Sequence, residues 1–113
     1  MIENRRKNPR IKVSVPVEIH VDGNAAPLHC ATSDISLGGC YIESMYPFPA
    51  GTHLELKLQV ADTLLIDAKV ITCDPQFGNG IAFVKMLPED SDKLAMFIDS
   101  ASPPADADSG KKP

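Results

Sequence analysis

Residues 13–21 read Val-Ser-Val-Pro-Val-Glu-Ile-His-Val, with a β-branched apolar residue at every odd-numbered position. This period of two predicts a β-strand with one buried face and one face in water. Pro16 cannot donate a backbone hydrogen bond to a neighbouring strand. We therefore expect this strand to lie at a sheet edge or to carry a bulge at Pro16.

The same alternation recurs along the chain, and turn-forming residues separate one stretch from the next. It predicts five further strands, at residues 28–35, 40–44, 53–60, 66–72 and 81–86. Many short strands at regular spacing are typical of an antiparallel sandwich or barrel. After Pro88, acidic residues and an apolar stripe of Leu94, Phe97 and Ile98 predict one helix, which we expect to cover an open barrel edge.

Composition indicates a single folded domain. The chain has 113 residues, of which 43% are hydrophobic and 23% charged, which is ordinary for one globular unit. We expect a flexible basic arm at residues 1–12, a barrel with its closing helix at residues 13–100 and a disordered tail at residues 101–113. No apolar run approaches the ~20 residues of a membrane span and no secretion signal is evident, so we expect a cytoplasmic protein without membrane contact.

We expect the cysteine and methionine side chains to pack in the core and to have no catalytic or metal-binding role. Cys30, Cys40 and Cys73 are odd in number and widely spaced, which suits reduced thiols in the cytoplasm. We expect them to be small core residues, and Met86 and Met96 to fill space in the same core. The sequence has no metal-ligand spacing and no catalytic triad, so we expect no metal, no cofactor and no enzymatic activity.

Charge is distributed unevenly along the chain. Residues 1–12 contain five Lys or Arg residues and one Glu, whereas the remainder contains six Lys against fourteen Asp or Glu. An acidic body disfavours nucleic acid, because binding of a long polyanion depends on many phosphate contacts. A short basic arm suits a small anion better, and a solvated leader of no function has the same composition.

The basic arm carries side chains that can hold such an anion. The planar fork of arginine is permanently charged and matches phosphate oxygens and the O6/N7 edge of guanine. Arg6 and Arg10 are separated by three residues, so both can converge on one ligand from a single segment. Pro9 keeps that segment out of a helix and limits its backbone.

A second group of candidate residues lies in Asp34-Ile35-Ser36-Leu37-Gly38-Gly39. Asp34 can accept hydrogen bonds from the two donors on one guanine edge, and Ser36 can donate or accept beside it. Gly38 and Gly39 permit positive φ and a close approach of ligand or backbone. Taken alone, the same residues also fit an Asx or Ser turn that merely closes a hairpin.

Together the two groups carry a resemblance. Arg6-x-x-x-Arg10, then a β-strand, then Asp34-x-Ser36-x-x-Gly39 resembles the PilZ domain family of bacterial cyclic di-GMP receptors, over residues 5 to about 98. The resemblance implies an all-β fold, a six-stranded antiparallel β-barrel with one C-terminal α-helix, and no catalysis. It implies that Arg6 and Arg10 grip phosphates and guanine faces. Asp34 and Ser36 would then read a guanine edge, for which Gly39 leaves space.

The expected function is that of a cyclic di-GMP receptor that signals to an unidentified downstream protein. The arm is expected to be mobile when empty and to become ordered when the ligand supplies negative charge. Arg5 and Lys7 add cations beyond those that one dinucleotide needs, so we expect two stacked cyclic di-GMP molecules per chain, with Arg5 among their contacts. In the alternative, these two cations only steer the anion inward.

A different class of function is also compatible with the fold. A nucleotide-independent PilZ-type adaptor in pilus or motility machinery has no need of an intact binding motif, and the intact motif therefore disfavours it. We expect no separate output domain.

Overall fold

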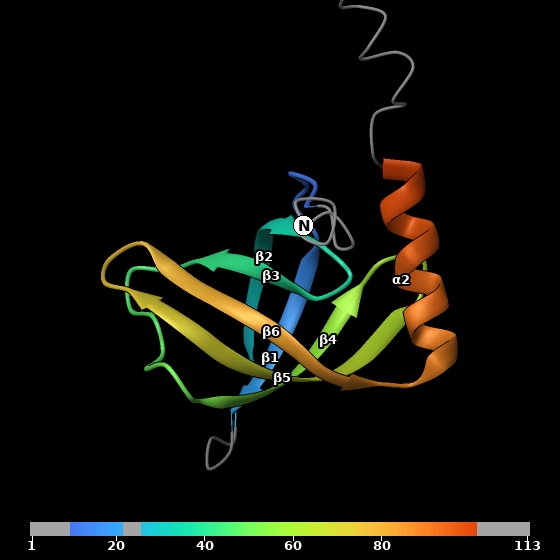
Figure 1. Cartoon of the computed structure of the whole chain (residues 1–113). Coiled ribbons are helices and arrows are strands. Elements are labelled where there is room, and N and C mark those ends of the chain that lie inside the picture. Colours follow the sequence, from blue (N-terminus) through green and yellow to red (C-terminus); the bar gives the residue numbers. More distant parts are fainter. Residues whose placement is uncertain (1–9, 22–25, 102–113) are drawn as a thin grey trace, which may run out of the picture.

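Six strands form a closed barrel in the computed structural model, which describes residues 10–21 and 26–101. Neighbouring strands follow the order β1-β2-β3-β6-β5-β4, and every pairing is antiparallel (Figure 1). The elements are β1 (Pro16–Val21), β2 (Leu28–Ile35), β3 (Gly39–Glu43), β4 (His53–Gln59), β5 (Thr63–Asp74), β6 (Gly78–Met86) and α2 (Pro88–Ala101). The expected barrel with one C-terminal helix is confirmed.

The barrel interior is filled by the alternating apolar residues. In β4, Leu54, Leu56 and Leu58 are fully buried while the residues between them are exposed. β5 repeats the pattern with Leu64 and Ile66. Each such side chain contributes about 1.5–3 kcal/mol by leaving water, so the period-two pattern accounts for most of the core.

Closure of the barrel contradicts the expectation for Pro16. β1 pairs with β2 on one side and with β4 on the other, without a register shift, so it is neither an edge strand nor bulged. The proline is accommodated because it is the first residue of the strand, a position where a missing N–H is tolerated.

The helix also differs from its expected role, because the described strands leave no open edge to cover. α2 stands beside the barrel (Figure 1) and buries Leu94 and Ile98 against the core, with contacts to β5. Met96 is 70% exposed, so the expectation that it fills the core is wrong. Two residues from Leu94, it cannot share the buried face of the helix. Met86 is half-buried and packs against the core.

The three cysteines are free thiols, and they differ in burial. Cys40 is fully buried, and desolvation raises the pKa of its thiol to about 12. Cys30 is half-buried against the core, and Cys73 is half-buried at the end of β5. The expected core role is therefore confirmed fully for Cys40 alone. No helix within the described residues is long and apolar enough to cross a membrane.

Asn79 in β6 fastens the loop between β3 and β4 to the barrel. Its side chain is buried. Its Oδ1 accepts a hydrogen bond from the Phe48 amide at 2.9 Å, and its Nδ2 donates to the carbonyls of Phe48 (2.9 Å) and Thr72 (3.1 Å). One amide side chain thus satisfies backbone groups of two separate segments.

Replacing Asn79 by Ala is expected to lower the free energy of unfolding by about 1–3 kcal/mol, because it leaves part-buried backbone groups without this partner. Urea denaturation followed by circular dichroism measures the loss. Thr63→Ala removes an exposed 2.9 Å hydrogen bond to Gln59 and serves as the control, with an expected loss below about 0.5 kcal/mol. Equal, small losses in both variants would show that Asn79 does not anchor the loop.

Candidate functional site

The base of the basic arm is attached to the end of β2 by two backbone hydrogen bonds. The Ile11 amide donates to the Ile35 carbonyl at 2.9 Å, and the Ile35 amide donates to the Ile11 carbonyl at 3.0 Å. Both isoleucine side chains are buried in the core. This short bridge places Arg10 directly beside the predicted 34–39 segment, 24 residues further along the chain.

Arg10 and Asp34 form an ion pair at this point. Arg10 Nη1 donates to Asp34 Oδ1 at 2.6 Å, and the two side chains are 56% and 25% exposed. Exposed pairs of this kind contribute about 0–1 kcal/mol to stability. The pair therefore orients both side chains without holding them firmly, and a ligand can replace either partner at small cost. Arg5, Arg6 and Lys7 lie outside the described residues.

Ser36 has the contacts of a hairpin turn. Its amide donates to the Gly39 carbonyl at 2.8 Å, its Oγ accepts from the Gly38 amide at 3.1 Å, and the same hydroxyl lies 3.4 Å from the Gly39 carbonyl. The Ser-turn alternative accounts for these contacts. The Ser36 hydroxyl is buried and already has these partners within the turn. Its expected contact with a guanine stays a prediction.

Gly38 and Gly39 lie where the backbone of β6 comes close to the turn. Neither Gly38 nor Gly39 adopts the positive φ that glycine permits. At Gly39, a Cβ atom would lie 2.1 Å from the Ile81 carbonyl oxygen, so the close pairing of β3 with β6 requires glycine here. The Gly38 carbonyl accepts from the Phe83 amide at 2.9 Å, which ties the turn to β6 as well.

A hollow of about 340 Å³ opens next to this turn, and we call it the motif hollow. It is lined by Arg10, Asp34, Gly38, Gly39, Tyr41, Ile71, Thr72, Gly80, Ile81 and Ala82. Its size lies at the lower end of the roughly 300–1,000 Å³ typical of ligand pockets. Four of the seven predicted site residues share this wall. Ser36 lies in the same turn without lining the hollow.

The residues of β5 and β6 that line the hollow were not predicted from the sequence. Ile71 is an exposed apolar residue where the alternation of β5 calls for a polar one, and that irregularity was an available signal. Gly80 donates its amide to Thr72 Oγ1 at 3.1 Å, and a Cβ atom there would lie 2.6 Å from that oxygen. Glycine inside a strand is a recognised sign of such a close approach.

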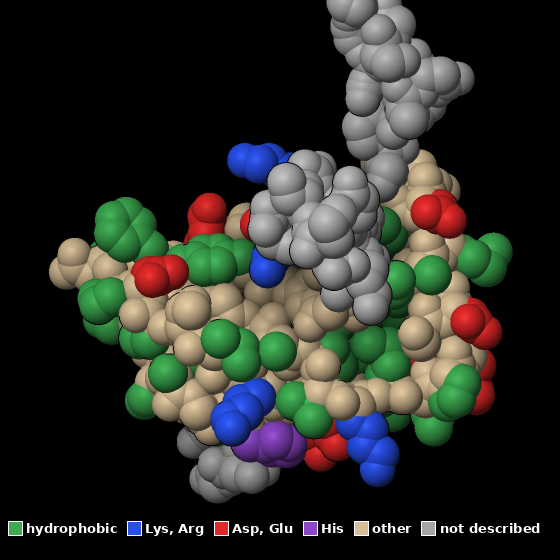
Figure 2. All heavy atoms as spheres, viewed as in Figure 1, with side chains coloured by type: hydrophobic (Ala, Val, Ile, Leu, Met, Phe, Trp, Pro, Cys, Tyr) green, Lys and Arg blue, Asp and Glu red, His purple; other side chains and the backbone are tan. Residues whose placement is uncertain are grey.

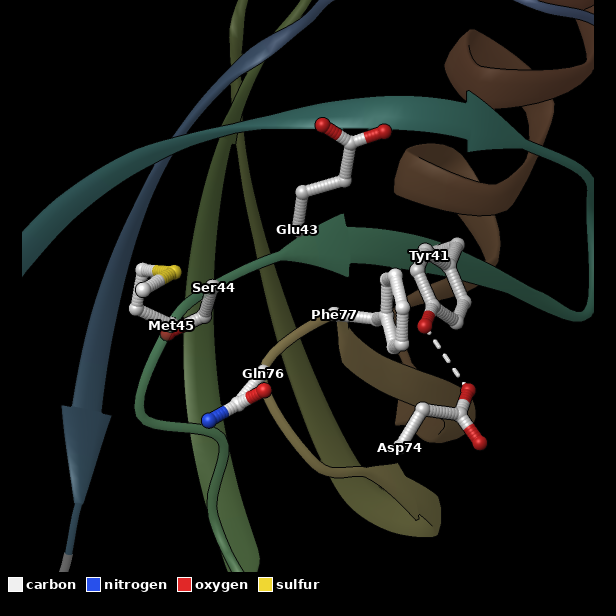
Figure 3. A pocket seen from close by; sticks show the side chains of 7 residues that line it. All are labelled: Tyr41, Glu43, Ser44, Met45, Asp74, Gln76 and Phe77. Atoms are coloured by element: carbon white, nitrogen blue, oxygen red, sulfur yellow. Dashed lines mark hydrogen bonds between the residues drawn. The ribbon is translucent and has the colours of Figure 1, made fainter.

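A second, larger hollow of about 750 Å³ lies at the tip of the β5–β6 hairpin (Figure 3), and we call it the hairpin hollow. Its lining contains none of the predicted site residues. Tyr41 is the only described residue that lines both hollows. Among the described residues, no group of His, Cys, Asp and Glu side chains is arranged to hold a metal ion.

Comparisons with known proteins agree with this architecture. The sequence model of the PilZ domain matches residues 4–100. No curated protein matches the chain. Among solved structures, the Bacillus subtilis inhibitor of motility (MotI/DgrA) is similar with a TM-score of 0.73 at 18% identity, over 85% of this chain and 50% of that protein.

Two further structures are similar at comparable identity. The PilZ domain of Escherichia coli YcgR, solved with c-di-GMP, has a TM-score of 0.66 at 18% identity, over 85% of this chain and 90% of that one. Borreliella burgdorferi PlzA, in complex with c-di-GMP, has a TM-score of 0.61 at 22% identity, over 79% and 39%. The chain thus spans half of the Bacillus protein and most of the isolated YcgR domain.

Substituting Ala at Gly39 is expected to destabilise the protein by about 2–3 kcal/mol, because the added Cβ forces the backbones of β3 and β6 apart. Thermal and urea unfolding without ligand measure this. Gly38→Ala is the matched control, since Gly38 is exposed and lacks a positive φ; its stability should stay within about 1 kcal/mol of the wild type. A Gly39→Ala protein as stable as the wild type would reassign this glycine from strand packing to ligand space.

Proposed function

The chain belongs to the PilZ domain family of non-catalytic cyclic di-GMP receptors, and we propose that it binds cyclic di-GMP in the motif hollow. The observation that carries the proposal is the Arg10–Asp34 pair at 2.6 Å on the wall of that hollow. The two halves of the motif, far apart in sequence, meet there. The c-di-GMP named in the YcgR and PlzA structures supports the same ligand class.

The two partners of the ion pair suit different parts of the ligand. Asp34 accepts from the N1–H and exocyclic amine of a guanine, which are both donors, while Arg10 turns to phosphate oxygens or a guanine face. Because the pair is partly exposed, separating it costs little. Ser36 fixes the turn, and Gly38 and Gly39 present bare backbone to the ligand.

The remaining contacts are assigned to the arm. Arg6 and Arg5 lie four and five residues before Arg10, whose neighbour Ile11 is attached to the end of β2, and we assign both to the same ligand. We propose that ligand charge orders this arm, and that the newly ordered surface signals to a downstream protein. The proposed location is the cytoplasm, where the three free thiols stay reduced.

We further propose two cyclic di-GMP molecules per chain. A stacked pair carries four phosphate charges, which match the cations Arg5, Arg6, Lys7 and Arg10. Guanine faces also stack favourably on arginine planes.

Calorimetric titration is expected to show binding of cyclic di-GMP and far weaker binding of cyclic di-AMP. Adenine lacks the two donors that Asp34 requires, and an unpaired carboxylate costs roughly 1–3 kcal/mol. Arg10→Ala should weaken cyclic di-GMP binding by about 1.5–3 kcal/mol while the melting temperature of the free protein hardly changes, since the ion pair is partly exposed.

Equal affinity for the two dinucleotides would remove the role assigned to Asp34. A wild-type protein that binds neither would favour the nucleotide-independent adaptor. A large fall in the melting temperature of free Arg10→Ala would make this arginine structural.

At saturation the same titration should give two ligands per chain, and Arg5→Leu should reduce that number or weaken the second site. The reason is that the stacked pair carries more negative charge than Arg6 and Arg10 alone can neutralise. A one-to-one stoichiometry unchanged in Arg5→Leu, with only a slower and more salt-dependent association, would show that Arg5 steers the ligand.

A further inference from the structure

The hairpin hollow combines aromatic, apolar and acidic side chains. It is lined by Tyr41, Glu43, Ser44, Met45, Asp74, Gln76 and Phe77, which come from β3, the residues after it and the β5–β6 turn (Figure 3). Of these residues, Tyr41 alone also lines the motif hollow, in which cyclic di-GMP is proposed above to bind.

The walls of the hollow are held in place by the backbone. The Phe77 amide donates to the Asp74 carbonyl at 2.9 Å and closes the turn, and the Ser44 amide donates to the Phe77 carbonyl at 2.9 Å. Gln76 has a φ of 67°, in the left-handed region that residues with a side chain rarely adopt. Such a conformation persists only where its surroundings enforce it, and it is often found at functional sites.

This fixed tip keeps large apolar side chains in water. Phe77 is 71% exposed, and Met45 and Tyr46 on the neighbouring segment are 64% and 89% exposed. Figure 2 shows apolar and acidic side chains side by side at this end of the molecule. Clustered exposed apolar groups on a fixed scaffold are typical of a surface that binds another molecule.

The charge of the hollow selects the kind of molecule. Two of its lining residues, Glu43 and Asp74, are carboxylates, and none is a Lys or Arg. Tyr41 donates its hydroxyl to Asp74 Oδ2 at 2.7 Å, which orients that carboxylate. The hydroxyl of a tyrosine is protonated at neutral pH, and this bond raises the pKa of Tyr41 further, to about 12. The second oxygen of Asp74 points away from the tyrosine (Figure 3).

We propose that the hairpin hollow docks an arginine-bearing segment of a protein partner. A guanidinium can pair with the Asp74 carboxylate while its plane stacks on Phe77, the negative charge of Glu43 in the same hollow adds to the attraction, and apolar neighbours in the segment can cover Met45. The same carboxylates repel phosphate, which disfavours both a nucleotide and an anionic lipid surface here. This docking does not depend on cyclic di-GMP binding.

The test is an amide NMR titration of the full chain with the blocked peptide acetyl-Gly-Arg-Leu-Arg-Gly-amide at up to millimolar concentration. Shift changes are expected to be confined to residues 41–46 and 74–78. A peptide with citrulline in place of arginine has nearly the same shape without the charge, and it should bind at least about fivefold more weakly.

Variants with matched controls localise the contact. Phe77→Ala and Glu43→Gln change exposed residues, so they should melt like the wild type, and each should weaken peptide binding about threefold. Leu65→Ala also changes an exposed apolar residue of the β5–β6 hairpin, but one outside this hollow, and it should bind like the wild type.

Several outcomes would overturn the proposal. They are equal binding of the citrulline peptide, shift changes elsewhere on the barrel, or no change at millimolar peptide. Phe77-dependent binding to phosphatidylglycerol–phosphatidylcholine vesicles would assign the tip to a membrane. Phe77-dependent self-association in sedimentation would assign it to a second copy of this chain.

Discussion

Pairing of β1 with β4 closes the barrel, and the other features of the molecule depend on that closure. Five residue pairs, from Val17 with Leu58 to Val21 with Leu54, join segments far apart in the chain. Because the ring is complete, the inward face of every strand is buried. The chain just before β1 is then carried past the end of β2, where Ile11 bridges to Ile35 and leaves Arg10 beside Asp34.

Local pattern in the sequence was enough to predict the elements, but not how they close. The alternation of apolar and polar residues in β4 and β5 identifies strands, because successive side chains of any strand point to opposite faces. Whether Pro16 lies at an edge depends instead on a partner some 40 residues away, which no periodicity encodes. The same gap explains the error for the helix: it was expected to cover an edge that closure removes. The prediction for Met96 was wrong because an apolar residue in a helix need not face the core of the protein.

At the candidate site, residue chemistry was predictable and residue geometry was not. The motif order drew attention to Arg10 and Asp34, which the structure brings into contact. The turn contacts of Ser36 and the approach of Ile81 to Gly39 depend on how β6 lies against β3. The sequence alone could not show how closely Ile81 approaches Gly39, and the space that Gly39 was expected to leave for a guanine stays a prediction.

Tyr41 is held in place by residues of two other strands. Its ring lies over Gly78, where an added Cβ would come within 3.0 Å of the ring, and its hydroxyl reaches Asp74 on β5. The residue lines both the motif hollow and the hairpin hollow. Rotating this ring breaks one hydrogen bond, at a net cost of about 0.5–1.5 kcal/mol, whereas sliding β3 breaks the pairings with both β2 and β6. A change in the wall that the two hollows share therefore requires only rotation of the Tyr41 side chain and leaves the strand pairings intact.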